Sequence, residues 1–272
     1  MNYQILDCTF RDGGYYNNWE YPLSLAKKYI SVVSKTDIKF VELGFRSINK
    51  KNKGLFWYTD DNLLKKLFIP KNINLGVMIN ASDYIIQSKY GDIDKVNLKK
   101  NFYNKKHIYF VRIAFHLKEI KHALKISNIL KSYGYFVGLN LMQISRLKIK
   151  EIEFASKLIN KAKPDVFYIA DSLGVINIKL LRKINKTIRK YWKGQLGIHA
   201  HDNLKFALKN TLEAKKLGFT WFDSTILGMG RGPGNVKTES LLQALNLKKG
   251  RKDLNKFIKR FFSKYLKIYN WG

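Results

Sequence analysis

The stretch QLGIHAHDNLKFALKNTLEAKKLGFTWFDSTIL, residues 195–227, carries the pattern of one complete strand–helix–strand unit and decides the fold. Its first and last seven residues are almost continuously apolar, as in strands that are covered on both faces in a parallel sheet. Between these runs, Asp202 or Asn203 can cap a helix, apolar residues follow a 3.6-residue period, and Gly218 ends the pattern. The stretch therefore predicts two parallel strands joined by a helix.

The same alternation recurs along the whole chain. Nearly continuous apolar runs predict eight strands, at residues 3–10, 40–45, 74–80, 108–115, 136–144, 166–171, 195–201 and 221–227. Helical periodicity lies between them, at residues 23–33, 119–132, 149–161, 178–191 and 202–218, whereas residues 49–71 predict a long loop followed by a short helix. Eight strand–helix units in about 250 residues are typical of a (β/α)8 TIM barrel, an α/β fold, and an open doubly wound sheet rarely needs eight such strands.

We expect the barrel to be a single catalytic domain that covers residues 1–250. Residues 251–272 are basic, and their apolar residues recur at helical spacing. This segment predicts a helical extension that packs on the barrel or at a subunit interface, and a homodimer is compatible with it. Such packing is a more frequent role for an amphipathic tail than contact with a membrane.

Composition favours a soluble, cytoplasmic protein. Of the 272 residues 46% are hydrophobic, the mean hydropathy is −0.28, and no apolar run approaches the roughly 18 to 20 residues that cross a bilayer. The first residues, MNYQILDCTFRDGG, lack the basic start, the long apolar stretch and the cleavage site of an export signal. Cys8 is the only cysteine, which excludes an internal disulfide and a cysteine-based zinc site.

The net charge of +31 comes from 51 Lys and Arg against 20 Asp and Glu. Only nine of these cations are Arg, and the lysines are spread over the whole length. Proteins that read phosphates and base edges favour clustered Arg. We therefore expect a solvated basic surface with no specific nucleic-acid partner, although its potential would still attract anionic substrates.

The C-terminal ends of the strands hold the active site in a barrel of this type, so polar residues there are the site candidates. In chain order these are Arg11, Asp12, Glu42, Arg112, His116, Asp171, Ser172, His199 and His201. His199 and His201 stand two apart in a predicted strand, so their side chains point to the same side. Two imidazoles and a carboxylate form a divalent-metal site with open positions, and Asp12 is the natural third ligand.

A second candidate feature is the glycine loop, GMGRGPGN at residues 228–235, which follows the eighth predicted strand. A loop with four glycines lets backbone N–H groups approach an anion or wraps tightly around a ligand. Arg231 in its middle and Asn235, an amide able to bind a metal, favour a functional loop over an ordinary turn. Arg11 beside Asp12 is either a structural ion pair or a group that stabilises a developing enolate oxygen.

Four motifs in this chain resemble those of the DRE-TIM metallolyases: LDCTFRDGG at residues 6–14, VELGF at 41–45, HAHDN at 199–203 and LGMGRGPGN at 227–235. That family includes 3-hydroxy-3-methylglutaryl-CoA lyase, 4-hydroxy-2-oxovalerate aldolase, and the isopropylmalate, homocitrate and citramalate synthases. The motifs stand in the family's order, on the predicted strands that the family uses. The resemblance spans most of the chain, from residue 6 to residue 235.

The resemblance implies a role for each matching position. Asp12, His199 and His201 would bind a divalent metal, Mn²⁺ or Mg²⁺ with Zn²⁺ and Co²⁺ as alternatives, and Asn235 would be a fourth ligand in lyase-like members. Arg11 matches the arginine that steadies the enolate, and Glu42 matches an acid that orders the pocket. In this chemistry the metal binds a 2-oxo acid or a β-hydroxy acid as a Lewis acid, and a base removes a hydroxyl proton so that a carbon–carbon bond breaks.

The chain departs from the family pattern at the base. The aldolases that it resembles carry a histidine at the position of Tyr15, and the synthases usually carry a glutamine there. Tyr15, Tyr16 or His116 would have to serve as base or relay, and a tyrosine needs a lowered pKa to do so near neutral pH. The loop cysteine of the acyl-CoA lyase is absent, which weakens that alternative. The chain ends soon after the eighth strand, so we expect a stand-alone barrel.

The sequence thus predicts a divalent-metal-dependent aldolase or lyase that makes or breaks a carbon–carbon bond next to a 2-oxo acid, through a metal-bound pyruvate-type enolate. Its partners would be a 2-oxo acid and an aldehyde, and the substrate-binding candidates are Arg46, Arg112, Ser172 and Arg231. Arg46 and Arg231 are candidates for a distal carboxylate or phosphate. The first alternative is a Claisen-type synthase that joins an acyl-CoA to a 2-oxo acid, and a remote one is a basic nucleic-acid-binding protein without catalysis.

Overall fold

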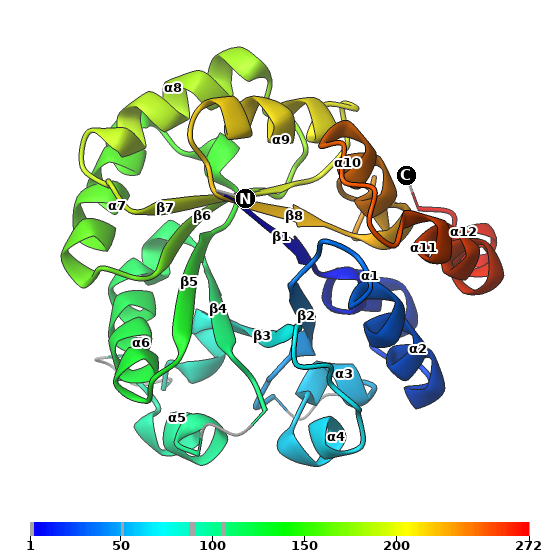
Figure 1. Cartoon of the computed structure of the whole chain (residues 1–272). Coiled ribbons are helices and arrows are strands. Elements are labelled where there is room, and N and C mark those ends of the chain that lie inside the picture. The colour runs from blue at the N-terminus through cyan, green and yellow to red at the C-terminus, as the bar shows by residue number, and fades with distance from the viewer. Residues whose placement is uncertain (1–2, 50–51, 87–90, 105–106, 272) are drawn as a thin grey trace.

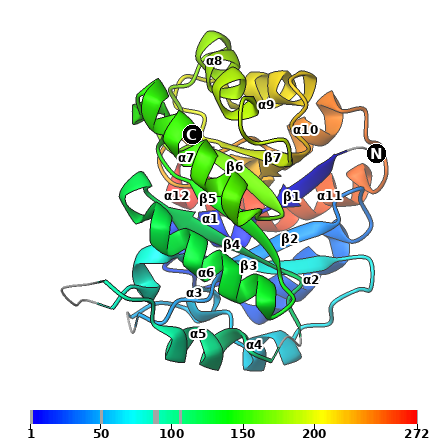
Figure 2. The same cartoon turned by 90° about the vertical axis from the view of Figure 1, so that its left-hand side faces the viewer.

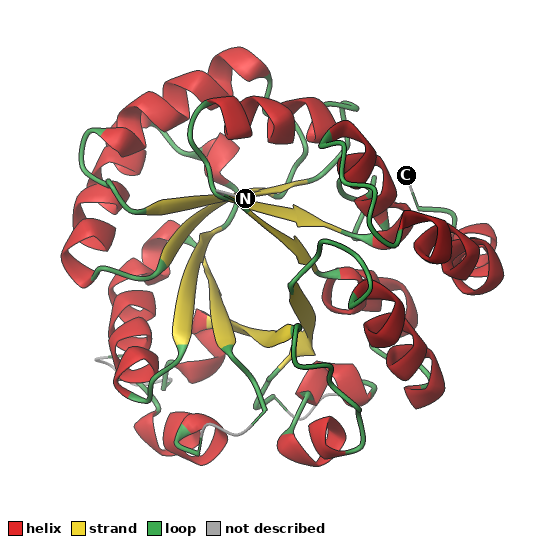
Figure 3. Cartoon of the chain, in the orientation of Figure 1, coloured by secondary structure: helices red, strands yellow, loops and turns green. Residues whose placement is uncertain are grey.

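A computed structural model describes residues 3–49, 52–86, 91–104 and 107–271. Eight parallel strands close into a barrel in the order β1 to β8, with helices on the outside (Figures 1 and 3). The predicted TIM barrel is therefore confirmed. The strands are β1 (Gln4–Asp7), β2 (Phe40–Phe45), β3 (Asn74–Asn80), β4 (Phe110–Phe115), β5 (Phe136–Leu141), β6 (Val166–Asp171), β7 (Gln195–Ala200) and β8 (Trp221–Ser224).

The helices form a ring around these strands, as the two views at right angles show (Figures 1 and 2). They are α1 (Thr9–Asn17), α2 (Leu23–Val33), α3 (Leu55–Tyr58), α4 (Asp61–Lys65), α5 (Lys95–Phe102), α6 (Ile120–Ser132), α7 (Ile149–Ala162), α8 (Ile178–Arg189), α9 (Ala207–Lys216), α10 (Thr238–Ala244), α11 (Arg251–Phe257) and α12 (Ser263–Tyr269). No helix among the described residues is long and apolar enough to cross a membrane.

Large side chains from the first residues of the strands fill the N-terminal end of the barrel. Phe40, Phe110, Val166 and Trp221 each begin a strand and are buried together in one cluster. The rings of Phe40 and Trp221 lie 4.5 Å apart, edge to face. Because this end is packed with aromatic rings, a site inside the barrel has to open at the other end, where the strands finish.

The first strand ends earlier than the sequence predicts. The predicted strand 3–10 stops at Asp7, and α1 begins at Thr9, so Arg11 and Asp12 lie in a helix and their predicted place at a strand end is wrong. The side chain of Asp7 explains the change, because its Oδ1 accepts hydrogen bonds from the backbone N–H of Thr9 at 2.9 Å and from the Thr9 hydroxyl at 2.5 Å. This bonding turns the chain into a helix directly above the strand.

Other boundaries also shift. The predicted strands 136–144, 195–201 and 221–227 end at Leu141, Ala200 and Ser224. The helix predicted at 202–218 begins only at Ala207, whose N–H is capped by Asp202 Oδ1 at 2.9 Å. Residues 49–71 contain two short helices, α3 and α4, instead of one, although residues 50–51 of that segment lie outside the described residues. The sequence analysis did not identify α1, α5 or α10.

Residues 251–271 form α11, a π-helical turn at Ile258–Phe262, and α12, which lie beside α2 and α10 (Figure 1). Residue 272 of the predicted extension lies outside the described residues. Leu254 and Phe262 are fully buried, and the Phe262 ring lies 6.4 Å from Phe10 of α1. Beyond α12, the indole N–H of Trp271 donates to the carbonyl of Leu227 at 2.9 Å. The segment thus packs on the barrel near the ends of β1 and β8.

Candidate metal centre and active site

Three buried side chains converge at the C-terminal end of the barrel: Asp12 from α1, and His199 and His201 from β7 and the residue after it. One ligand atom from each lies within 4.8 Å of the others. The two Nε2 atoms are 3.3 Å apart, and His199 Nε2 is 3.7 Å from Asp12 Oδ2. The structure therefore brings together the three residues that the sequence analysis proposed as metal ligands.

The outer nitrogen of each imidazole has a partner that only accepts hydrogen bonds. His199 Nδ1 lies 2.9 Å from Asp223 Oδ2, and His201 Nδ1 lies 3.2 Å from the carbonyl oxygen of Arg231. Each Nδ1 must then carry the proton of a neutral ring, which leaves two Nε2 lone pairs that face each other. A divalent cation satisfies such a pair, and ligating histidines usually have outer partners of this kind. The residues present thus fit a divalent metal.

The charge states of the residues in this cluster also fit a divalent metal. Burial lowers the pKa of His201 to about 4, which keeps its imidazole neutral at physiological pH. Burial alone would raise the pKa of Asp12, but the guanidinium of Arg11 and the hydrogen bond from Asn235 lower it below its usual range. Asp12 is therefore anionic beside a neutral His201, the ionisation that metal binding by these two residues requires.

Asn235 is the end of the glycine loop and reaches the same cluster. Its Nδ2 donates to Asp12 Oδ2, and its buried Oδ1 has no hydrogen-bond partner within the described residues. An unpartnered amide oxygen beside three ligand atoms fits a fourth ligand. Gly230 makes this approach possible, because a Cβ there would overlap both Asn235 and Asp12.

Buried ion pairs inside the barrel contact the cluster of Asp12, His199 and His201 and hold it in place. Glu42 Oε1 accepts from Arg11 Nε and from Arg112 Nη2, and Glu42 Oε2 accepts from Arg112 Nε, each at 2.7 Å. Arg112 Nη1 then bonds Asp223 Oδ2 at 2.6 Å, and the same oxygen holds His199. Glu42 and Arg112 therefore act through Arg11, Asp223 and His199, which they hold in place.

A small cavity of about 60 Å³ opens beside the ligands. Its walls are Arg11, Asp12, Tyr15, Phe45, Met78, Asn80, Ala114, Asn140, Met142, Ala170, Ser172, His199, His201 and Arg231. Arg11 has a further nitrogen, Nη2, that is buried and has no hydrogen-bond partner in the described part of the chain. A guanidinium with a free N–H next to a metal site is placed to receive an anionic oxygen of a substrate.

Tyr15 lines this cavity at the position where the aldolases carry histidine. The guanidinium of Arg231 lies 5.8 Å from the centre of its ring. Tyr15 is 44% exposed, but loss of water around its hydroxyl in the cavity raises its pKa above the usual value, with a smaller contribution in the same direction from the Asp12 carboxylate. The hydroxyl therefore stays protonated near neutral pH, which suits a proton donor and not a base.

Arg112, His116 and Tyr16 do not line the cavity. Arg112 lies beneath it, with its guanidinium in the ion pairs described above. His116 caps a short turn at Leu117–Glu119, where its N–H donates to Glu119 Oε2 at 2.9 Å. Tyr16 bonds the glycine loop from outside, with its hydroxyl 2.9 Å from the carbonyl oxygen of Gly232. Ser172 does line the cavity, and its Oγ accepts from the N–H of Gln143 at 3.1 Å.

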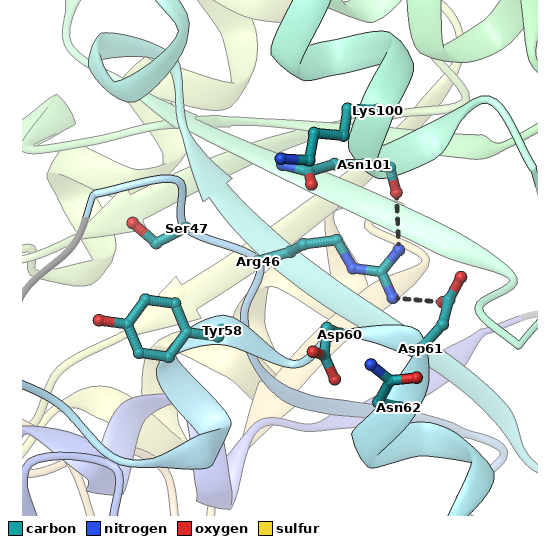
Figure 4. Close-up of a pocket in the computed structure, with 8 residues that line it drawn as sticks. All are labelled: Arg46, Ser47, Tyr58, Asp60, Asp61, Asn62, Lys100 and Asn101. Atoms are coloured by element: carbon teal, nitrogen blue, oxygen red, sulfur yellow. Dashed lines mark hydrogen bonds and ion pairs between the residues drawn. The ribbon is translucent and has the colours of Figure 1, made fainter.

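Arg46 lies in a different cavity, of about 450 Å³, between α3, α4 and α5 (Figure 4). Its guanidinium donates to the carbonyls of Thr59 and Asn101, each at 2.9 Å, and to Asp61 at 3.0 Å. The side chain thus ties the segment after β2 to the neighbouring helices. The structure does not bring Arg46 together with the metal ligands.

Asp223, which orients His199 and neutralises Arg112, is not among the site residues predicted from the sequence. A signal was available, because Asp223 is an acid inside the apolar run 221–227, and an unpaired buried carboxylate is costly. Asn80 and Asn140 were missed as well. Asn140 lies in β5, and its buried Oδ1 makes no hydrogen bond within the described residues.

Comparison with known proteins agrees with this geometry. The profile of the HMGL-like family matches residues 70–260. Among curated proteins, the chain is 25% identical to an oxaloacetate decarboxylase of Mycobacterium tuberculosis, over 89% of this chain and 69% of that protein. It is 26% identical to a 4-hydroxy-2-oxovalerate aldolase of Carboxydothermus hydrogenoformans, over 89% of this chain and 70% of that protein.

Solved structures with a similar fold include an aldolase-like domain and an HMG-CoA lyase. The N-terminal domain of a Bacteroides vulgatus protein assigned provisionally as an aldolase superposes with a TM-score of 0.82 at 31% identity, over 99% of this chain and 89% of that one. The HMG-CoA lyase of Bacillus subtilis shares the fold, with a TM-score of 0.77 at 15% identity, over 96% and 93% of the two chains. The chain therefore belongs to the HMGL-like family, the DRE-TIM metallolyases whose motifs it carries.

Proposed function

We propose that this protein is a divalent-metal-dependent lyase that makes or breaks a carbon–carbon bond next to the carbonyl group of a 2-oxo acid, through a pyruvate-type enolate. The observation that carries the proposal is the pair of Nε2 lone pairs facing each other beside Asp12, with the free N–H of Arg11 on the same cavity. The names of two relatives, 4-hydroxy-2-oxovalerate aldolase and oxaloacetate decarboxylase, both refer to 2-oxo acids and support it.

Each side chain has a distinct task in this proposal. Asp12, His199 and His201, with Asn235, hold the metal, which when bound supplies Lewis acidity toward a substrate oxygen. Arg11 donates its free N–H to the oxygen on which negative charge develops, and Glu42 keeps that guanidinium in place. The cavity of about 60 Å³ has room for a few water-sized groups, which matches a small 2-oxo acid at the reacting end.

The first test measures, by NMR, the uptake of deuterium into the methyl group of pyruvate in heavy water. With Mn²⁺ or Mg²⁺ present, we expect the protein to exchange these protons, because formation of an enolate makes the methyl carbon exchangeable. Addition of EDTA, or replacement of His199 by Ala, should reduce exchange to the background rate. Lack of exchange by protein that has bound its metal would contradict the pyruvate-type enolate and favour an acyl-CoA synthase.

Tyr15 favours a second candidate, decarboxylation of a 2-oxo acid that carries a β-carboxylate. Aldol cleavage needs a base to take a hydroxyl proton, whereas loss of CO₂ forms the enolate without a base and then needs a proton donor. Apart from the metal ligands and two arginines, Tyr15 is the titratable group in the described wall of the cavity, and its pKa is raised. A protonated Tyr15 can give the enolate carbon its proton.

Replacement of Tyr15 by Phe separates these two candidates. If the protein is a decarboxylase, we expect the variant to release CO₂ from oxaloacetate at a rate about 10²–10⁴-fold lower, since it lacks the proton donor. Because the pKa of Tyr15 is raised, the wild-type rate should fall only at a pH above the usual range of tyrosine, and Tyr15→Phe should lack this fall. Wild-type protein that cleaves 4-hydroxy-2-oxo acids but leaves oxaloacetate intact would contradict decarboxylation.

A further inference from the structure

The glycine loop, residues 228–235, holds two parts of the proposed metal centre. Asn235 Nδ2 donates to Asp12 Oδ2, and the carbonyl oxygen of Arg231 lies 3.2 Å from His201 Nδ1. The first contact places an amide at the ligands, and the second fixes which nitrogen of His201 carries its proton. Any movement of this loop therefore changes the position of one ligand and the orientation of another.

The two ends of the loop, residues 228–230 and 234–235, are buried, and its middle is not. Gly228, Gly232 and Gly234 have φ values of +69°, +65° and +80°, a region that glycine enters freely. The two ends of the loop meet where the Asn235 N–H donates to the carbonyl of Gly228 at 2.9 Å. Arg231 and Gly232, near the tip, are exposed. The path of such a loop depends on what holds it from outside.

Two aromatic side chains are among the contacts that hold it there, beside the N–H of Asp202, which donates to the carbonyl of Gly234 at 2.9 Å. Trp271, which is 5% exposed, donates its indole N–H to the carbonyl of Leu227, the residue directly before the loop. A Cβ on Gly234 would lie 3.4 Å from Cδ1 of the same indole, so the ring is also packed against the end of the loop. Tyr16 donates its hydroxyl to the carbonyl of Gly232 at 2.9 Å, which fastens the tip.

These two aromatic residues also contact each other. The rings of Tyr16 and Trp271 lie 5.7 Å apart, and Tyr269 at the end of α12 lies 5.9 Å from Tyr16. The start, the tip and the end of the loop are thus attached to one aromatic cluster, which joins α1 to the C-terminal segment. None of the three aromatic residues lines the cavity beside the metal ligands.

We propose that Trp271 and Tyr16 are positioning residues for the metal centre: the C-terminal segment sets the affinity for the metal by holding the glycine loop that carries Asn235 and the carbonyl of Arg231. This inference rests on the proposed metal centre. It assigns a role in metal affinity to residues 263–271, a segment that otherwise packs on the outside of the barrel.

The test is calorimetric titration of Mn²⁺ into purified full-length protein and its variants. We expect Trp271→Leu to raise the dissociation constant for Mn²⁺ by about 10–100-fold. This is the effect of removing an outer partner of a metal ligand. Trp271→Phe keeps an aromatic ring beside Tyr16 but loses the N–H and part of the indole, so its affinity should recover part of the way. Tyr16→Phe should weaken binding less than Trp271→Leu, since it removes a single hydrogen bond.

Trp192 offers a matched control. It is buried like Trp271, and its indole N–H also donates to a backbone carbonyl, that of Gln195 at 2.9 Å, but at the start of β7 and away from the ligands. Trp192→Leu should lower the thermal midpoint and leave the Mn²⁺ affinity unchanged. Tyr16→Phe keeps the inference testable if Trp271→Leu does not fold, because it deletes only a hydroxyl group.

Three outcomes would overturn or separate the proposals. If Trp271→Leu folds and binds Mn²⁺ with the affinity of the wild type, the positioning role is overturned. If only Tyr16→Phe folds, wild-type affinity for Mn²⁺ in that variant overturns it. An equal loss of affinity in Trp271→Leu and Trp192→Leu would also overturn it, because general loosening of the barrel would then be the cause. A wild-type protein that binds no Mn²⁺ or other divalent ion would instead remove the proposed metal centre, and the proposed function with it.

Discussion

Replacing His199 by Ala is expected to abolish turnover and to weaken metal binding by more than about 100-fold, since loss of a ligand exceeds the 10–100-fold cost of losing an outer partner. The imidazole supplies one of the two facing Nε2 atoms and links the ligands to Asp223. The fold should survive, because Arg112 still pairs with Asp223. The measurement is Mn²⁺ titration together with 2-oxo acid turnover.

Thermal unfolding adds an independent readout for His199→Ala. A metal present at 100 times its dissociation constant stabilises a folded protein by about 2.7 kcal/mol, so Mn²⁺ should raise the melting temperature of the wild type and leave that of the variant unchanged. His122→Ala, in α6 and apart from the ligands, is the matched control and should behave as wild type. Full activity in His199→Ala would reject the site.

Replacing Glu42 by Ala is expected to have the largest effect on stability. Its carboxylate, fully buried, neutralises Arg11 and Arg112 at once, and its removal leaves two buried guanidinium groups short of a partner. Breaking a buried ion pair by removing one partner costs about 3–5 kcal/mol. Urea unfolding should show this loss in the free energy of unfolding, and turnover should fall with it, since Arg11 is no longer held.

Glu153 supplies the comparison for this prediction. It forms a partly exposed pair with Lys157 at 3.2 Å on one turn of α7. Glu153 Oε1 also accepts from the Tyr191 hydroxyl at 2.5 Å. Since a surface pair and a single hydrogen bond contribute about 1 kcal/mol each at most, Glu153→Ala should lower the free energy of unfolding less than Glu42→Ala does. Similar losses in the two variants would mean that the buried ion pairs contribute no more than a surface pair does.

Most of the barrel could be predicted from the sequence because both faces of each strand are buried. Residues 40–45, 74–80 and 166–171 match strands β2, β3 and β6 residue for residue, since these short, largely apolar runs have the length of a strand that is covered on both faces. Helices with few apolar residues escaped detection. In α5 only Leu98 and Phe102 are buried, too few to show a helical period.

The convergence of the candidate metal ligands could be predicted for a similar reason, since the spacing of His199 and His201 in a strand fixes their direction. The role of Arg46 could not, because its partners are backbone carbonyls of Thr59 and Asn101, which no sequence pattern reveals. Asp12 was predicted as a ligand although its helix was predicted as a strand. Its position above the barrel depends on the side-chain bonds of Asp7, which periodicity does not detect.

The pairing of β1 with β8 has a consequence for the order of events during synthesis. Cys8 Sγ and the carbonyl of Ser224 meet at this seam although they stand 216 positions apart in the chain. Asp12 leaves the ribosome early, whereas the histidines and Asn235 follow much later, and contacts of such long range form slowly. No N-terminal fragment that ends before Asn235 contains the whole proposed ligand set, so binding of a metal by all four residues would report that the two ends of the barrel have met.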